Sequence, residues 1–128
     1  MEIERLRKID FFESVPDEEL ERFAEMAESG TLDEGKELVK AGTWPHHLYA
    51  IEEGEVEVRR DGDKIATLGE GDVVGETGVV KRGLRNATVV ATEPVRVIAF
   101  TQEQVKKMRK ALPELDQELH DLLEKRSS

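Results

Sequence analysis

Short segments with alternating apolar residues follow one another from Thr31 to Phe100, and glycine-containing breaks separate them. The segments are ELVK, HLYAI, EVEVRR, KIATL, DVVGE, NATVVAT and VRVIAF. A period of two is typical of strands, and Asp61-Gly62 between two of them indicates a tight hairpin. Because no helical segment intervenes, a parallel Rossmann sheet is excluded. The pattern predicts seven or eight strands in an antiparallel sandwich or jelly-roll barrel.

The N-terminal part is predicted to be helical. Apolar residues in VPDEELERFAEMAES recur at the helical spacing i, i+3, i+4, i+7. They are Leu20, Phe23, Ala24 and Ala27. Pro16 suits the first turn of this helix and Ser14 is the expected cap. The preceding IERLRKIDFF predicts a shorter helix.

Two further helices are predicted after the strands. Thr101 is the expected cap of QEQVKKMRKAL, and Pro113 interrupts the chain before PELDQELHDLLEKR. An apolar stripe on the last segment comprises Leu115, Leu119, Leu122 and Leu123. This stripe could cover the barrel, close over a ligand or pair with a second chain.

One domain is therefore expected over residues 1–128, mainly β with flanking α. Its N-terminal helices occupy 1–30, an eight-stranded antiparallel jelly roll occupies 31–100, and two C-terminal helices occupy 101–126. A chain of 128 residues is long enough for one hydrophobic core.

Composition limits the function classes. The absence of cysteine excludes disulfides, thiolate metal sites and cysteine catalysis. The net charge is −10, from 29 acids and 19 bases. Since DNA binding needs a basic face, no direct DNA binding is expected, and the basic cluster Lys106, Lys107, Arg109 and Lys110 is interpreted as a solvated helix face. No apolar run approaches the roughly 20 residues of a membrane span, and the N-terminus lacks a signal-peptide core. A cytoplasmic protein without a membrane partner is expected.

The segment GDVVGETGVVKRGLRNATVV carries the candidate chemistry. Its glycines allow backbone N–H groups to approach a ligand, and a helical turn after Gly75 would direct unpaired N–H groups towards an anion. The Arg85 guanidinium can pair with two phosphate oxygens, and the Glu76 carboxylate can accept hydrogen bonds from sugar hydroxyls. Together these groups predict a site for a ribose phosphate.

The same segment resembles the phosphate-binding cassette of the cyclic nucleotide-binding domain family. The matching residues are Gly75-Glu76-Thr77-Gly78-Val79 and Arg85-Asn86-Ala87-Thr88. Glycines at 35, 42, 54 and 71 stand where the family has barrel turns, and the helical flanks match as well. The resemblance covers roughly residues 5 to 125.

The resemblance implies a role for each cassette residue. Glu76 would accept the ribose 2′-hydroxyl and Arg85 would pair with the cyclic phosphate. The N–H groups of Thr77 and Gly78 would complete the anion site, and Asn86 stands where a side chain can contact phosphate or a guanine amino group. The predicted ligand-binding set is Gly75, Glu76, Thr77, Gly78, Arg85, Asn86, Ala87 and Thr88. Arg82 is the next candidate if Arg85 is the wrong arginine.

The resemblance also implies a regulatory mechanism. Val79 is the expected hinge, an apolar residue that packs on the C-terminal helices and moves when ligand binds. The family often has proline before the arginine, where this chain has Leu84, so the loop is less restrained. A threonine that would favour cyclic GMP is absent at Asn86. The expected ligand is therefore cyclic AMP, with cyclic GMP left open, in a regulatory domain that is not an enzyme and uses no cofactor.

Two other functions remain open. The barrel could be a scaffold that binds a protein partner or a second copy through the leucine stripe. A cupin-like metal site is the third hypothesis, since His46 and His47 are adjacent. Neighbouring residues on a strand point to opposite faces, however, and His120 lies far off on a predicted helix, so a metal site is disfavoured.

Overall fold

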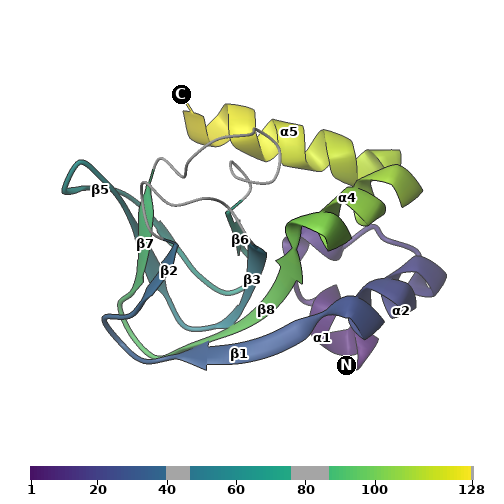
Figure 1. Cartoon of the computed structure of the whole chain (residues 1–128), viewed down its shortest axis with the longest axis horizontal. Helices are drawn as coiled ribbons and strands as arrows, with labels where there is room; N and C mark the ends of the chain where they lie inside the picture. The colour runs from purple at the N-terminus through teal and green to yellow at the C-terminus, as the bar shows by residue number, and fades with distance from the viewer. Residues whose placement is uncertain (40–46, 76–86, 128) are drawn as a thin grey trace.

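The computed structural model describes residues 1–39, 47–75 and 87–127 (Figure 1). Its strands are β1 Glu28–Leu32, β2 Glu37–Val39, β3 His47–Glu53, β4 Val56–Arg60, β5 Asp63–Leu68, β6 Val73–Val74, β7 Thr88–Ala91 and β8 Val95–Thr101. Its helices are α1 Ile3–Arg7, the 3-10 helix η1 Asp10–Phe12, α2 Asp17–Met26, α4 Gln102–Ala111 and α5 Pro113–Ser127.

Two four-stranded antiparallel sheets form the barrel. The first sheet has the order β1-β8-β3-β6 and the second has the order β2-β7-β4-β5. Figure 1 shows the helices gathered on one side of the barrel, with α5 running along its top. The described residues thus contain eight strands between helical flanks, which confirms the predicted fold class.

The predicted hairpin joins β4 to β5. Asp61 and Gly62 have φ of 54° and 84°, and the flanking residues Arg60 and Asp63 pair directly. Positive φ at both central residues is the two-residue turn whose twist matches that of antiparallel strands. The Asp-Gly pair is sufficient to predict this turn, because the turn conformation depends on only four consecutive residues.

The first strand departs from the prediction. β1 begins at Glu28, inside the segment 1–30 that is expected to be helical. Its sequence ESGTL has no apolar alternation, and four of its five residues are exposed. β1 is a strand because β8 holds it through five consecutive pairs, from Glu28↔Ala99 to Leu32↔Val95, and this long-range pairing leaves no local signal.

The predicted cap at Ser14 is also wrong. α2 begins at Asp17, Pro16 occupies the cap position, and no side chain caps the helix. The three acids Asp17, Glu18 and Glu19 in the first turn supply favourable charge at the positive end of the helix dipole instead.

The first sheet separates two hydrophobic clusters. On its outer face Leu48 and Phe100 pack with the N- and C-terminal helices, and the Phe12 ring lies 5.6 Å from the Phe100 ring. On its inner face Ile51 and Val97 pack with the second sheet. The two faces of β3, β6 and β8 therefore serve different cores, and we call the inner one the barrel interior.

Most of the leucine stripe of α5 packs against other parts of the same chain. Leu115 and Leu119 are fully buried in the outer cluster, and Leu122 packs against it. Of the roles left open for the stripe, packing within the chain holds for these residues, and the buried Leu115 and Leu119 cannot also form a surface for a second chain. The side chain of Leu123 lies outside the described set. Within the described residues, no helix is both long and apolar enough to span a membrane.

Candidate functional site

The cassette 75–88 connects the two sheets of the barrel. Gly75 follows β6 in the first sheet, and Ala87 precedes β7 in the second sheet. Gly75 has φ of 94°, a left-handed conformation that glycine adopts without a Cβ penalty. The first residue of the predicted cassette therefore has a backbone conformation that favours glycine.

Most of the predicted ligand contacts lie outside the described residues. They are Glu76, Thr77, Gly78, Arg85 and Asn86, and the predicted hinge Val79 also lies outside. Gly75, Ala87 and Thr88 are described, and they fix both ends of the cassette. The roles of the intervening residues remain predictions.

The strand ends beside the cassette are apolar on their inner face. Val74 and Val89 are 2% and 4% exposed, and both belong to the barrel interior. Thr88 pairs across the strands with Arg59 of β4. The Arg59 guanidinium is already engaged by Glu57, with Nε donating at 2.7 Å. An anion at the cassette would thus need a cation other than Arg59, as the prediction for Arg85 supplies.

The C-terminal helices are fixed to each other and to the N-terminal helices. The Thr101 hydroxyl accepts from the Gln104 backbone N–H, and the Gln104 side chain accepts from Thr101 N–H, which confirms the predicted cap. Gln104 Nε2 also donates to the carbonyl of Met26 at 3.1 Å. Arg109 Nε donates to Asp116 Oδ1 at 2.5 Å across the break between α4 and α5. Side-chain contacts therefore join α4 both to α2 and to α5.

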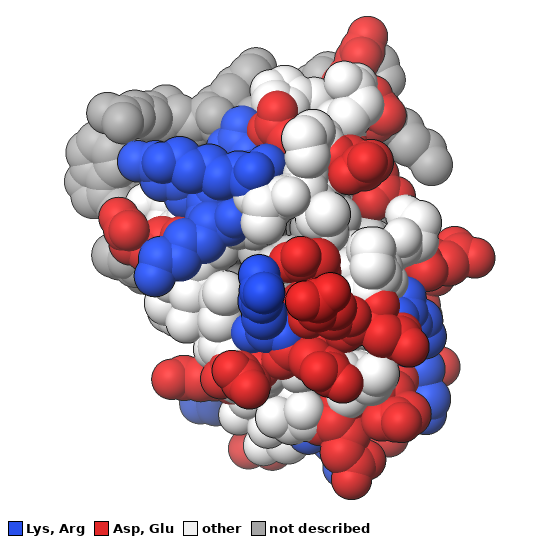
Figure 2. All heavy atoms as spheres, turned by 90° about the vertical axis from the view of Figure 1, so that its right-hand side faces the viewer, with Lys and Arg blue, Asp and Glu red and all other residues white. Residues whose placement is uncertain are grey.

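Charge is unevenly distributed over the surface. Figure 2 shows a cluster of Lys and Arg at the upper left, while the rest of that face is mainly Asp and Glu with scattered Lys and Arg. On α4, Lys106, Lys107 and Lys110 are exposed, whereas Arg109 is half-buried and bound to Asp116. The solvated helix face predicted for this cluster thus holds for its three lysines.

The described histidines do not form a metal site. Among the described residues no group of three or more His, Cys, Asp or Glu side chains could hold a metal ion. The His47 ring instead stacks on Tyr49, two residues along β3, with 5.6 Å between ring centroids. His46 lies outside the described residues.

Comparison with known proteins decides the family. The model of the cyclic nucleotide-binding domain matches residues 30–111, from β1 to the end of α4 and across the cassette. The chain belongs to the cyclic nucleotide-binding domain family. This confirms the resemblance found in the sequence, and it agrees with the prediction that the domain is not itself an enzyme.

Relatives and solved structures agree with this assignment. The type II regulatory subunit of cAMP-dependent protein kinase from Drosophila melanogaster is 34% identical over 101 residues, which cover 76% of this chain and 27% of the subunit. The chain thus spans about a quarter of that relative. A cAMP-bound PfPKA-R structure superposes with a TM-score of 0.91 over 98% of this chain and 43% of its own, and at 20% identity this likeness shows the fold.

A third similar structure holds a different ligand. The regulatory subunit of a cAMP-independent protein kinase A from Trypanosoma cruzi, bound to guanosine, is 27% identical with a TM-score of 0.78. The match covers 82% of this chain and 39% of that one.

Proposed function

We propose that this cyclic nucleotide-binding domain binds cyclic AMP at residues 75–88 and passes the binding event to its C-terminal helices. The family match across the whole cassette is the observation that carries the proposal. The cAMP-dependent regulatory subunit from Drosophila supports the choice of ligand class. The apolar strand ends at Val74 and Val89 are suited to cover the uncharged parts of the ligand.

Each part of the ligand has a proposed partner. Arg85 and the N–H groups of Thr77 and Gly78 bind the cyclic phosphate, since a guanidinium and converging amides are both suited to an anion. Glu76 accepts the ribose 2′-hydroxyl. Asn86 offers an amide where a threonine would favour the guanine amino group, so cyclic AMP is preferred to cyclic GMP.

The proposed output is a movement of the C-terminal helices. Phosphate capture orders the cassette, Val79 changes its packing, and α4 and α5 close over the base. Arg109 and Asp116 join these two helices, and Gln104 joins α4 to α2, so the helices move as one unit. A protein partner then recognises the new arrangement.

Calorimetry with the purified chain tests the proposal. Cyclic AMP should bind more tightly than cyclic GMP. The absence of binding by either nucleotide up to about millimolar concentration, roughly −4 kcal/mol, would overturn it. Amide hydrogen exchange in α4 and α5, measured with and without cyclic AMP, tests the helix movement separately.

A second candidate function is a regulatory domain that does not respond to cyclic AMP. The similarity to the guanosine-bound Trypanosoma cruzi subunit favours it. Guanosine in the same titration distinguishes the two, because a nucleoside has no phosphate for Arg85 to bind. Tight guanosine binding without cyclic AMP binding would select this second function.

A further inference from the structure

β1 is an edge strand whose outer side is unprotected. It pairs only with β8, and within the described residues no backbone hydrogen bond uses its other side. Its central residues Ser29, Gly30 and Thr31 are uncharged and exposed. Its pairing runs through five residues without a register shift, so the edge is regular. Natural sheets usually protect such an edge with charges, proline or bulges.

The other edge strands differ from β1. β5 carries the charges Asp63 and Lys64, and its ladder with β4 is interrupted by a register shift. β2 and β6 are only three and two residues long. Among the described edges, β1 alone is regular, five residues long and uncharged at its centre.

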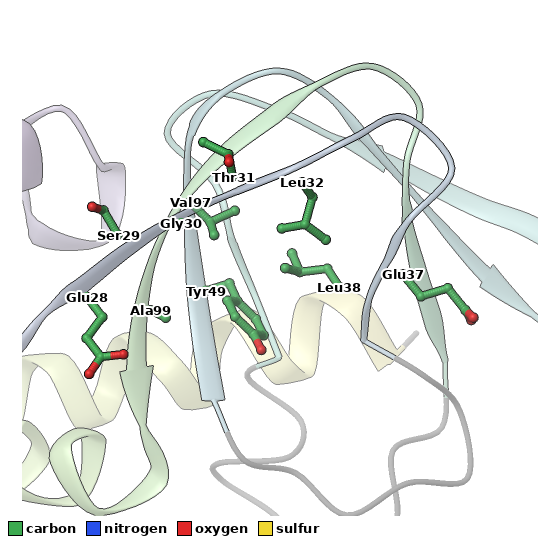
Figure 3. A pocket seen from close by; sticks show the side chains of 10 residues that line it. All are labelled: Glu28, Ser29, Gly30, Thr31, Leu32, Glu37, Leu38, Tyr49, Val97 and Ala99. Carbon is green, nitrogen blue, oxygen red and sulfur yellow. The ribbon is translucent and has the colours of Figure 1, made fainter.

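A groove lies beside this edge (Figure 3). Its volume is about 270 Å³, near the lower end of the roughly 300–1,000 Å³ of small-molecule pockets. In Figure 3 the side chains of Leu32, Leu38, Val97 and Tyr49 point towards a common space between β1 and β2. The described lining contains none of the residues at the cassette ends.

Two carboxylates stand at opposite ends of the groove. Glu28 comes from β1 and Glu37 from β2, and both line the groove. Both residues are exposed, and neither forms an ion pair with another described residue. The connection between the strands adds Asp33 and Glu34. The groove is therefore apolar at its floor and negative at its ends.

We propose that the β1 edge and its groove bind an extended, basic segment of a partner protein by strand addition. The partner backbone pairs with β1, one or two apolar side chains occupy the groove between Leu32 and Leu38, and a Lys or Arg meets Glu28 or Glu37. A second copy of this chain is disfavoured as the occupant, because it would bring the same carboxylates and a net charge of −10 to the interface. This interaction goes beyond nucleotide binding and does not depend on it.

A library of random eight-residue peptides displayed on phage tests the proposal against the full chain. The selected peptides should alternate apolar with polar residues and carry Lys or Arg. When synthesised, they should slow amide exchange at residues 28–32. The Gly30→Leu substitution should fill the groove and so lower the affinity for these peptides about tenfold or more. A Cβ at Gly30 would meet no atom within 4 Å, and thermal denaturation checks that the leucine variant is folded.

Charge reversal provides a second, independent variant. Glu28→Lys combined with Glu37→Lys should also weaken the affinity for the peptides about tenfold. Glu93→Lys changes an exposed residue that does not line the groove and should leave the affinity within about twofold. Peptides without basic residues, or binding unaffected by both groove variants, would overturn the proposal. A concentration-dependent dimer that Gly30→Leu abolishes would identify a second copy as the occupant and would also overturn it. Titration of the same variants with cyclic AMP shows whether nucleotide binding at the cassette is changed, and so separates an effect on the groove from an effect on the cassette.

Discussion

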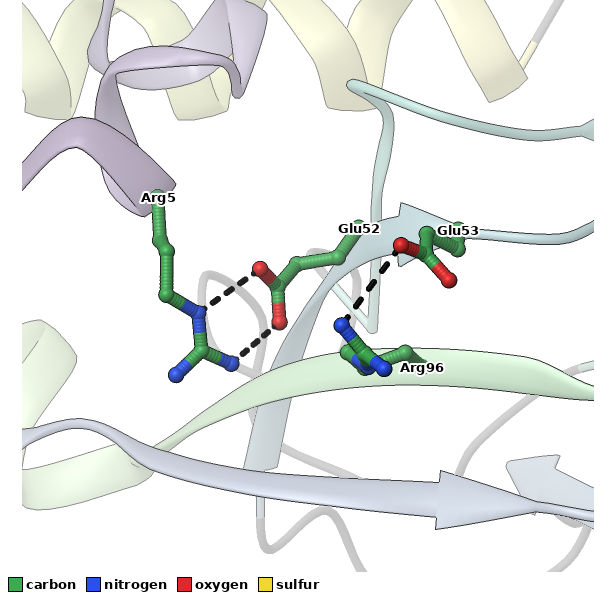
Figure 4. Close-up of polar contacts among 4 residues, drawn as sticks. All are labelled: Arg5, Glu52, Glu53 and Arg96. Atoms are coloured by element: carbon green, nitrogen blue, oxygen red, sulfur yellow. Dashed lines mark hydrogen bonds and ion pairs between the residues drawn. The ribbon is translucent and has the colours of Figure 1, made fainter.

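Arg5 and Glu52 form a two-point contact between the first helix and the barrel, although 47 positions separate them in the sequence. Arg5 Nε donates to Glu52 Oε2 at 2.9 Å, and Nη2 donates to Oε1 at 2.5 Å (Figure 4). The Glu52 side chain is only 11% exposed. The neighbouring Arg96–Glu53 pair is longer, at 3.5 Å, and its side chains are 49% and 61% exposed. The two adjacent pairs differ in burial and geometry, which allows one to serve as a control for the other.

Replacing Arg5 should destabilise the domain. Arg5→Met keeps much of the aliphatic stem but leaves the Glu52 carboxylate without its donors, which should cost about 1–3 kcal/mol. Arg96→Met should cost less than about 0.5 kcal/mol, because an exposed pair contributes little. Urea denaturation at pH 7 measures both. Equal losses in the two variants would contradict a special role for the Arg5 contact.

This contact should also make stability depend on pH. The hydrogen bonds from Arg5 hold the pKa of the Glu52 carboxyl below its usual range, against the opposing effect of burial. A folded pKa below the unfolded one means that the stabilisation is complete above the unfolded value of about 4.5 and is lost as the pH falls through the folded pKa. The stability difference between wild type and Arg5→Met should therefore shrink on acidification. A difference that is constant from pH 7 to pH 3 would contradict the assignment.

Glu118 should have the opposite effect. Burial raises the pKa of the Glu118 carboxyl on α5, and the carboxylates of Asp121 and Glu13 raise it further. A folded pKa above the unfolded one penalises the folded state once the pH rises above the unfolded value, and the penalty is absent at lower pH. Glu118→Gln should therefore stabilise the domain at pH 7, by less than about 1 kcal/mol because the group is partly solvated. The gain should vanish near pH 4, and Glu93→Gln, which removes an exposed charge elsewhere, should show no such pH-dependent gain.

Two turn glycines should tolerate substitution very differently. Gly54 has φ of 95°, and a Cβ there would lie 2.5 Å from the Pro94 carbonyl oxygen. Gly35 has φ of 87° with no atom within 4 Å of a built Cβ. Gly35→Ala should cost only the left-handed conformation, about 1 kcal/mol, whereas Gly54→Ala adds a backbone clash and should cost about 2 kcal/mol more. Thermal denaturation measures the stability of both variants. Similar losses of stability would show that the backbone at Pro94 shifts and relieves the clash.

The cap of α4 should contribute measurably to stability. Thr101→Ala removes the hydroxyl that accepts from the Gln104 N–H, which should cost about 1 kcal/mol. Thr101→Ser keeps the acceptor and should recover most of the loss. A serine variant as unstable as the alanine variant would show that the threonine methyl, rather than the cap, is responsible.

Arg85 should dominate cyclic nucleotide affinity if the proposed function holds. Arg85→Ala would leave a bound phosphate without its guanidinium and should cost on the order of 2–5 kcal/mol in binding free energy. Arg82→Ala, three residues earlier in the cassette, is the matched control and should change affinity little. Calorimetry with cyclic AMP measures both. An effect below about 1 kcal/mol at Arg85 and a large one at Arg82 would reassign the phosphate contact.

Features encoded in neighbouring residues can be predicted from the sequence. The Asp61-Gly62 hairpin and the Thr101 cap each depend on a few consecutive residues, and both predictions are confirmed. The cassette belongs to the same class, since its residue types and their spacing are sufficient to indicate the family. Only its two ends, at Gly75 and Ala87, lie among the described residues.

Tertiary structure decides the features that depend on distant partners. β1 has no alternation of its own and is a strand because β8 pairs with it. The leucines of α5 could face a ligand, a partner or the core, and Leu115 and Leu119 face the core because the N-terminal helices leave an apolar surface there. Arg5 and Glu52 meet only when α1 packs against β3. Local sequence specifies turns, caps and alternation, whereas pairing between distant segments depends on contacts that form only in the folded chain.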